Sequence, residues 1–231
     1  MQTLVDGQVY ALRRGFFNMY VLVNGDSITL VDTLTSAQTV DSVRQELAQH
    51  GLDFARVRQV FITHAHYDHV GGLTALQAAL NVRTIAHRRE APIVRGEQTV
   101  ARPRPQDVDF LSRLILASVN FTITPARVDT EVQEGAKLDE VLPGIEVIEL
   151  PGHTYGQIGL WWPEKRLLLG GDVMMHLPWG LTMPFRLASP DWAAAKDSVR
   201  KVAALDVEVL GLGHGPAIMG GAAAKVRALL K

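Results

Sequence analysis

The chain has 231 residues, of which 47% are hydrophobic and 20% are charged, and its formal net charge at pH 7 is −1. Such a balanced charge creates no strong field of one sign, so nothing points to nucleic acid or to a membrane surface as partner. The sequence contains no cysteine, so a metal ion would have to be held by nitrogen and oxygen ligands.

The N-terminal residues show no apolar core behind a basic start, so we expect no signal peptide. No stretch approaches the roughly 18 consecutive apolar residues that a membrane span needs. We therefore expect a cytoplasmic protein that acts on a small-molecule substrate, and the oligomeric state stays open.

The first third predicts strands followed by a helix. β-branched and apolar residues indicate strands over Val9–Arg14, Met19–Gly25 and Ser27–Leu34, with a hairpin turn between the last two. A helix with apolar residues at helical spacing follows and ends before Gly51.

A strand over Val57–Ile62 and a helix over Gly72–Leu80 come next. Residues 83–135 are rich in arginine and proline and show little periodicity, and we interpret them as an insertion. The apolar spacing at 107–119 predicts a helix inside it.

Strands return over 144–150, 157–162 and 166–172. The helix that follows is predicted to have Ser189 as its N-cap and Pro190 as its first residue. A strand over 207–212 and a helix over 222–230 complete the pattern. Two blocks of strands, each followed by helix, suggest two αβ halves packed sheet to sheet.

Metal-binding residue types lie just beyond the ends of these apolar strands, where rigid scaffolds hold functional loops. The set consists of His64, His66, Asp68, His69, His153, Asp172 and His214. Residues i and i+2 of an extended chain point the same way, so His64 and His66 can share one ion. Seven ligands exceed a tetrahedral site and suit two ions, most suitably Zn²⁺, with Fe, Mn or Co as alternatives.

The segments "THAHYDHVGG", "LPGHTYGQIGL", "LLLGGDVMM" and "GLGHGP" resemble the motifs of the metallo-β-lactamase superfamily. This resemblance implies one domain over residues 1–231 with an α/β fold: a four-layer αββα sandwich of two mixed sheets, packed face to face with helices outside. It implies that His64, His66 and His153 bind one metal, and that Asp68, His69 and His214 bind the other. Asp172 would bridge them, and Asp32 would support the site from behind.

The expected activity is hydrolysis of a small ester, thioester, lactone or phosphoester by a metal-bridging hydroxide. Asp68 is the expected catalytic residue, as a ligand that also moves a proton. Asp172 and the absent leader argue against a true β-lactamase, and Met175 stands where similar lactonases have tyrosine. The chain ends soon after His214, without the helical extension of glyoxalase II, although it is most similar to the glyoxalase II and lactonase branches.

Two other functions stay open on the sequence alone: an oxidoreductase like the sulfur dioxygenases with one iron, and a non-catalytic metal-binding module. His87 and His176 are more typical of ordinary loop histidines than of ligands. Trp179, close behind Asp172, is the best candidate for a wall of the substrate pocket.

Overall fold

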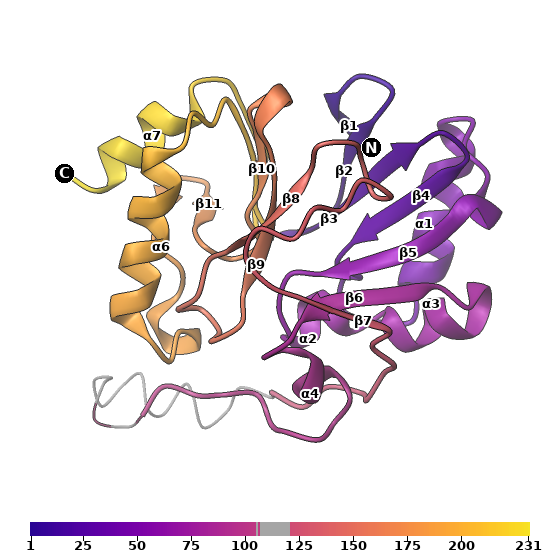
Figure 1. Ribbon diagram of the computed structural model, residues 1–231, viewed down its shortest axis with the longest axis horizontal. Helices are drawn as coiled ribbons and strands as arrows, with labels where there is room; N and C mark the ends of the chain where they lie inside the picture. Colours follow the sequence, from indigo (N-terminus) through magenta and orange to yellow (C-terminus); the bar gives the residue numbers. More distant parts are fainter. Residues whose placement is uncertain (105, 107–120) are drawn as a thin grey trace.

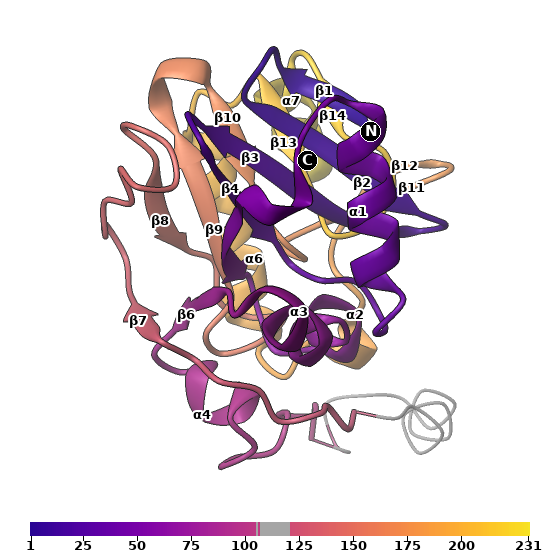
Figure 2. The ribbon, with the colours of Figure 1, turned by 90° about the vertical axis from the view of Figure 1, so that its right-hand side faces the viewer.

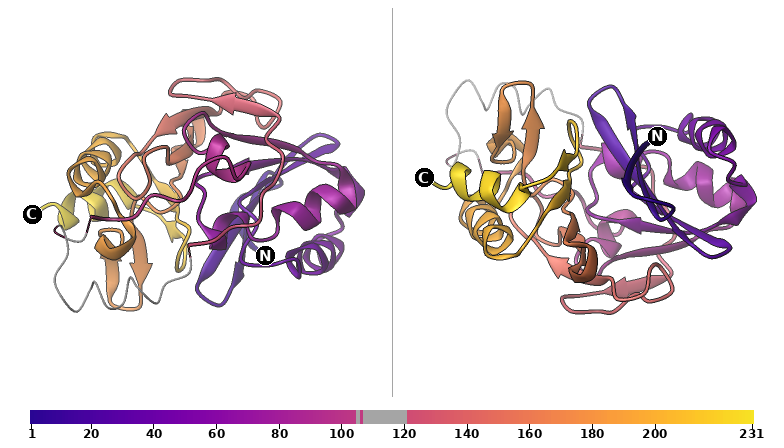
Figure 3. Two further views of the ribbon diagram at one scale, coloured as in Figure 1. Left: turned by 90° about the horizontal axis from the view of Figure 1, so that it is seen from below. Right: turned by 90° about the horizontal axis from the view of Figure 1, so that it is seen from above.

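The computed structural model describes residues 1–104, 106 and 121–231. Two β-sheets face each other, and helices cover the outer side of each sheet (Figures 1 and 3). This arrangement confirms the predicted α/β sandwich with two mixed sheets. The helix predicted at 107–119 lies outside the described residues.

The first sheet has seven strands in chain order, β1 to β7, of which β1 to β4 are antiparallel and β4 to β7 are parallel. Their bounds are Gln2–Val5, Val9–Arg14, Phe17–Asn24, Ser27–Val31, Val57–Ile62, Arg83–His87 and Thr130–Val132. Because β4, β5 and β6 are parallel, their carboxyl ends meet at one edge of the sheet.

The second sheet has five strands in the order β14-β13-β10-β9-β8, and only β10 and β13 are parallel. The bounds of β8, β9, β10, β13 and β14 are, in this order, Glu146–Glu149, Ile158–Trp162, Leu167–Leu169, Val209–Gly211 and Ile218–Met219. A separate hairpin consists of β11 (Met175–Leu177) and β12 (Gly180–Thr182).

Helices α1 (Thr39–Gln49) and α3 (Leu73–Leu80) cover the outer face of the first sheet, as Figure 2 shows. Helices α6 (Trp192–Ala204) and α7 (Ala222–Leu229) cover the second sheet (Figure 1). Two one-turn helices, α2 (Tyr67–Val70) and α4 (Ala91–Val94), follow β5 and β6. Within the described residues, no helix is both long and apolar enough to cross a lipid bilayer.

Alternation along the strands builds three separate apolar layers. In β3, Met19 and Val21 pack under the helices, while Tyr20 and Leu22 pack between the sheets. In the same way Leu168 of β10 faces α6 and α7, whereas its neighbours face the other sheet. Successive strand residues point to opposite faces, so a strand covered on both sides must be apolar throughout.

The structure changes two sequence-based expectations about the elements. The range 83–135 contains two strands of the first sheet, β6 near its start and β7 near its end, so it is not wholly an insertion. The N-cap of α6 is Asp191, whose carboxylate accepts the amide of Ala194 at 3.0 Å, and not Ser189. Ser189 instead donates its hydroxyl to the carbonyl of Phe185, because it lies before the chain turns into the helix.

Candidate metal centre

All seven predicted site residues come together at the edge where the two sheets meet. His64, His66, Asp68 and His69 lie on the loop and short helix α2 that follow β5. His153, Asp172 and His214 come from separate connections after β8, β10 and β13. All seven side chains are buried. The metal-binding atoms that follow the different strands therefore lie close together in the interior.

His64, His66 and His153 form one set of converging nitrogens, which we call the three-histidine group. Nδ1 of His66 lies 3.1 Å from Nε2 of His64 and 3.0 Å from Nε2 of His153. Ring nitrogens this close repel one another wherever two of them face each other with bare lone pairs. A cation shared by the three removes that repulsion.

Hydrogen bonds at the far side of two rings determine which nitrogens are bare. The Thr63 hydroxyl donates to Asp32, so the ring of His64 donates from Nδ1 to Thr63 Oγ1 at 3.1 Å. The Ser189 hydroxyl donates to a carbonyl, so His153 donates from Nδ1 to Ser189 Oγ at 3.3 Å. In both rings Nε2 is then unprotonated, and its lone pair points into the three-histidine group, where it could bind a metal.

Asp68, His69 and His214 form a second set, which we call the carboxylate group. Nε2 of His214 lies 3.3 Å from Oδ2 of Asp68, and Nε2 of His69 lies 3.7 Å from the same oxygen. The group therefore offers two imidazoles and a carboxylate, a donor set that suits zinc and other divalent transition metals.

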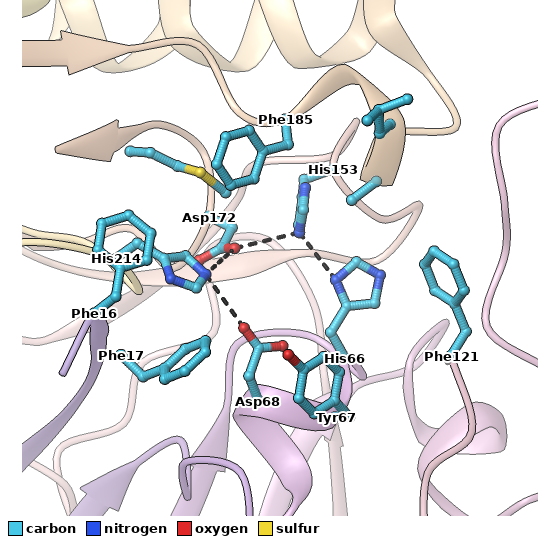
Figure 4. Close-up of a pocket in the computed structure, with 13 residues that line it drawn as sticks. Phe16, Phe17, His66, Tyr67, Asp68, Phe121, His153, Asp172, Phe185 and His214 are labelled. Carbon is cyan, nitrogen blue, oxygen red and sulfur yellow. Dashed lines mark hydrogen bonds and ion pairs between the residues drawn. The ribbon is translucent and has the colours of Figure 1, made fainter. Parts of the chain in front are cut away.

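Asp172 lies between the two groups. Its Oδ2 is 2.9 Å from Nε2 of His214 and 3.3 Å from Nε2 of His153, and its Oδ1 is 3.4 Å from Nε2 of His69. Figure 4 shows this carboxylate facing the imidazoles of His153 and His214. One side chain thus reaches donors of both groups, as a bridging ligand must.

The electrostatics of the two groups differ. Burial, followed by the neighbouring His153, lowers the pKa of His66 to about 3, and burial lowers the pKa of His153 to about 4. Burial also lowers the pKa of His64 well below its ordinary value. The three-histidine group is therefore neutral at pH 7 and has lone pairs ready for a metal.

In the carboxylate group, burial lowers the pKa of His214, but Asp172 and Asp68 outweigh it and raise that pKa to about 9. Asp32, Asp172 and Asp68 likewise raise the pKa of His69 well above its ordinary value against the effect of burial. Burial would raise the pKa of Asp172, yet His214 and His69 hold it well below its usual range. At this end of the cluster, the acidic side chains therefore favour protonation of both imidazoles.

Several buried polar atoms of the cluster have no hydrogen-bond partner among the described residues. They include Nε2 of His69, Oδ1 of Asp172, Nε2 of His66 and Nδ1 of His214. Leaving such atoms unsatisfied costs about 1–3 kcal/mol each. A bound cation would engage the first two directly, so the residues present fit a metal centre, and the histidine–aspartate cluster implies divalent metal binding.

Asp32 supports the carboxylate group as the resemblance implies. Its Oδ2 accepts Nδ1–H of His69 at 2.7 Å, and its Oδ1 accepts the amide of Thr63 at 2.9 Å. The residue follows β4 in a left-handed conformation with φ of 63°. A non-glycine residue at such an angle costs free energy, and the contacts of its carboxylate offset that cost.

Glu90 is a supporting residue that sequence reasoning missed. Its carboxylate accepts the amide of Ala65, between two donor histidines, and the amide of Gly156, both at 2.8 Å. The side chain is 1% exposed, and burial raises its pKa although the amides oppose this. Glu90 therefore clamps together the two loops that present the three-histidine group.

The loop of His214 is anchored from the first sheet. The side-chain amide of Asn18 donates to the carbonyls of Leu212 and Gly215, at 2.8 and 2.5 Å. The hydroxyl of Tyr20 also donates to the carbonyl of Leu212, at 2.5 Å. No short motif marks these residues, because their partners are more than 190 residues away in the chain.

A cavity of about 430 Å³ opens beside the cluster. Of the seven donors, its wall includes His66, Asp68, His153, Asp172 and His214 (Figure 4). The volume lies in the range of small-molecule sites. The cluster is therefore buried from behind and accessible to a small molecule from one side.

Three other sequence-based candidates lie outside this cavity wall. His87 is buried and binds Glu149 through Nε2 at 2.9 Å, and His176 donates from Nδ1 to the carbonyl of Pro216 at 2.7 Å. Both act as ordinary hydrogen-bonded histidines, as expected. The expectation for Trp179 is wrong: its side chain is 78% exposed at the β11–β12 turn, whereas Met175, on the same hairpin, does line the cavity.

Comparison with known proteins agrees with this fold. The model of the metallo-beta-lactamase superfamily matches residues 12–214. The chain therefore belongs to the metallo-beta-lactamase superfamily, as its motifs predict.

Two relatives and one solved structure illustrate the relationship. The probable metallo-hydrolase YflN of Bacillus subtilis (strain 168) is 27% identical over 203 residues, which cover 82% of this chain and 75% of the relative. A hydroxyacylglutathione hydrolase of Anaeromyxobacter dehalogenans (strain 2CP-C) is 33% identical over 151 residues, 65% of this chain and 44% of the relative. This chain thus spans about half the length of the hydroxyacylglutathione hydrolases that it matches.

A metallo-beta-lactamase family protein from Thermus thermophilus has a similar fold, with a TM-score of 0.74 and 22% identity. The match covers 98% of this chain and 79% of that one. The near-complete coverage shows that both halves of the sandwich share the fold.

Proposed function

We propose that the protein is a dinuclear metal-dependent hydrolase of a small ester, thioester, lactone or phosphoester, built as one domain over residues 1–231. The observation that carries the proposal is the position of Asp172, within 3.4 Å of donor nitrogens from both groups. The three-histidine group would hold one ion, the carboxylate group the other, and Asp172 would bridge them. With no thiolate among the donors, zinc fits best, and Fe, Mn or Co would also fit.

Two bound divalent ions would supply hydroxide near neutral pH, because they lower the pKa of a shared water to about 7. The protein's own contribution is positioning. Thr63 and Ser189 orient the rings of His64 and His153 so that Nε2 of each faces the other nitrogens of the three-histidine group, where it could hold an ion. Asp68 reaches the cavity wall with its carboxylate, so we propose that it also carries a proton toward the leaving group.

The relatives support hydrolysis as the reaction type. Some relatives are named probable metallo-hydrolases, and others are named hydroxyacylglutathione hydrolases. Because the chain spans about half the length of the latter, their substrate is not carried over to it. What the names of the relatives support is hydrolysis that depends on a metal.

Metal analysis and an activity panel test this proposal together. Purified protein should contain about two divalent ions per chain and should turn over at least one of a lactone, a thioester, a carboxylic ester or a phosphodiester. Asp172→Ala should lose metal and abolish turnover. His176→Gln is the matched control, since His176 lies close by but outside the cavity wall, and it should keep both. Full turnover by Asp172→Ala would contradict the proposal.

One observation favours a second candidate, a mononuclear iron oxidoreductase like the sulfur dioxygenases. The three-histidine group is a complete three-donor site by itself. About one iron per chain, together with oxygen uptake on a persulfide substrate, would establish it. The third hypothesis, a non-catalytic metal module, is disfavoured by the cavity that reaches five of the donors.

A further inference from the structure

The part of the cavity wall outside the donor cluster is mostly apolar. It consists mainly of Phe16, Phe17, Phe121, Met175, Phe185 and Leu187. These residues come from chain segments far apart in the sequence, and Figure 4 shows the phenyl rings arranged around the donors. The apolar surface forms only when these distant segments come together in the folded protein. The short metal-binding motifs do not predict it.

The apolar surface begins directly at the donors. The ring centroid of Phe16 lies 4.9 Å from that of His214, and the ring of Phe17 lies 5.3 Å from it. On the other side, the ring of Phe121 lies 6.1 Å from that of His66. A bond placed at the donors would therefore have its neighbouring atoms in contact with phenyl rings.

Away from the metal donors, the described wall offers no charged partner to an anionic substituent. Apart from the donors, the one ionisable group of that wall is the phenol of Tyr67. A carboxylate or phosphate on the chain of the substrate would lose its hydration against apolar rings without a cationic side chain to replace it. The exposed Arg102 stacks on the ring of Phe121 at 4.7 Å and is not part of the described wall.

We propose that the substrate is an uncharged carboxylic ester, thioester or lactone whose apolar acyl chain lies against Phe121 and Phe185. This inference rests on the proposed hydrolase function. Water adds to the acyl carbon, the bond to the leaving oxygen or sulfur breaks, and the leaving group takes a proton. The product acid then ionises.

A substrate series with one leaving group tests the acyl chain. Among p-nitrophenyl esters from acetate to octanoate, kcat/KM should rise about fourfold per methylene until the cavity is filled. A matched pair tests charge at constant length: the hexanoate ester should exceed the adipate monoester, which ends in a carboxylate, by about tenfold or more. Equal rates, or a preference for the charged ester, would overturn the inference.

A charge introduced into the wall should reverse this preference. Phe185 is 47% exposed, so the chain should tolerate Phe185→Arg, which circular dichroism can verify. This variant should shift the ratio of hexanoate to adipate rates toward adipate by about tenfold. Trp179→Arg adds the same charge at an exposed aromatic residue outside the wall, and it should leave the ratio unchanged. The same shift in both variants would contradict a role of the wall.

Binding of matched amides separates this inference from the proposed function. Hexanamide and adipic acid monoamide differ in the same way as the esters but require no hydrolysis, and titration calorimetry on the metal-loaded protein compares them. Tighter binding of hexanamide without hydrolysis of any ester would support the apolar site and overturn the hydrolase. Hydrolysis without preference for apolar chains would leave the hydrolase and overturn the apolar site.

Discussion

The two donor groups of the cluster solve the same problem in different ways. The three-histidine group, formed by His64, His66 and His153, is kept neutral by burial, with pKa values of about 3 and 4 for the last two. The carboxylate group of Asp68, His69 and His214 is kept charged by acidic neighbours. One end is thus prepared for a cation by its lone pairs, and the other by its negative charge.

This difference shows that the distances between the donor atoms do not by themselves determine the affinity of each group for a metal ion. A metal entering the three-histidine group displaces little, because its nitrogens are already unprotonated. A metal entering the carboxylate group must first displace protons from His69 and His214. The two positions should therefore differ in their response to pH, to mutation and to loss of supporting residues.

Removing one donor from each group should have the largest effect. His153→Ala and His214→Ala should each lose about one ion per chain and reduce hydrolysis about a thousandfold or more, since each leaves an incomplete site. Mass spectrometry of metal content and steady-state kinetics check this. If either variant retained both ions, its residue would not be a ligand, and the division into two groups would be wrong.

Acidification should empty the carboxylate group first. The raised pKa of His214, about 9, keeps its imidazole protonated at every lower pH, so a metal must release that proton. Affinity of this group should fall about tenfold per proton for each pH unit below 9. The three-histidine group, with pKa values of about 3 and 4 for His66 and His153, should stay loaded at pH 6.

Zinc titrations at pH 6 and pH 9, in two buffers of different ionisation enthalpy, measure this difference. Two ions bound at pH 9 and one at pH 6, with proton release at pH 7, are the expected results. Equal affinity at both pH values would show that acidic neighbours do not hold protons on the carboxylate group.

The residues behind the donors should matter unequally. Asp32→Asn replaces the charged partner of His69 and should weaken metal binding about 10- to 100-fold. Ser189→Ala removes only a neutral contact of 3.3 Å to His153 and should weaken it a few fold at most, about the effect of one net hydrogen bond. Competition with a chromophoric chelator measures both variants, and the reverse order would contradict this ranking of supports.

The smallest changes in metal binding should come from variants of the residues that hold the loops of the metal ligands in place. Glu90→Gln disturbs two buried amides near the three-histidine group, and Asn18→Ala leaves two carbonyls near His214 without their donor. Each should lower the free energy of unfolding by about 1–3 kcal/mol, measured by urea denaturation. In metal titrations, Glu90→Gln should affect only the three-histidine group and Asn18→Ala only the carboxylate group.

The residues that sequence reasoning located are those with a local signature. The seven donors follow apolar strands, and the strand Val57–Ile62 has the predicted bounds because its run of apolar residues is unbroken at its end. Strands β6 and β7 were missed because short strands among arginines and prolines show no clear period. Asp191 and not Ser189 is the N-cap of α6, because the backbone enters the helix at Trp192. The sequence alone does not determine at which of these residues the helix begins.

Residues whose role depends on distant partners could not be predicted. Glu90 accepts amides 25 and 66 residues away, and Asn18 binds a carbonyl 194 residues away. The apolar wall is of the same kind, since Phe16, Phe121 and Phe185 meet only in the folded protein. Trp179 is near Asp172 in the sequence, but at the turn of the β11–β12 hairpin its side chain is exposed.

The cluster is tightly packed from behind, and this has a kinetic consequence. A side chain at Gly213 would collide with Oδ1 of Asp172, and His64 is 0% exposed. Among the described residues, the cavity is therefore the open route by which metal ions would exchange. We expect a small chelator that enters it to strip the metal at a rate proportional to its concentration, whereas a bulky chelator must wait for spontaneous dissociation and should show a rate that does not depend on how much is added.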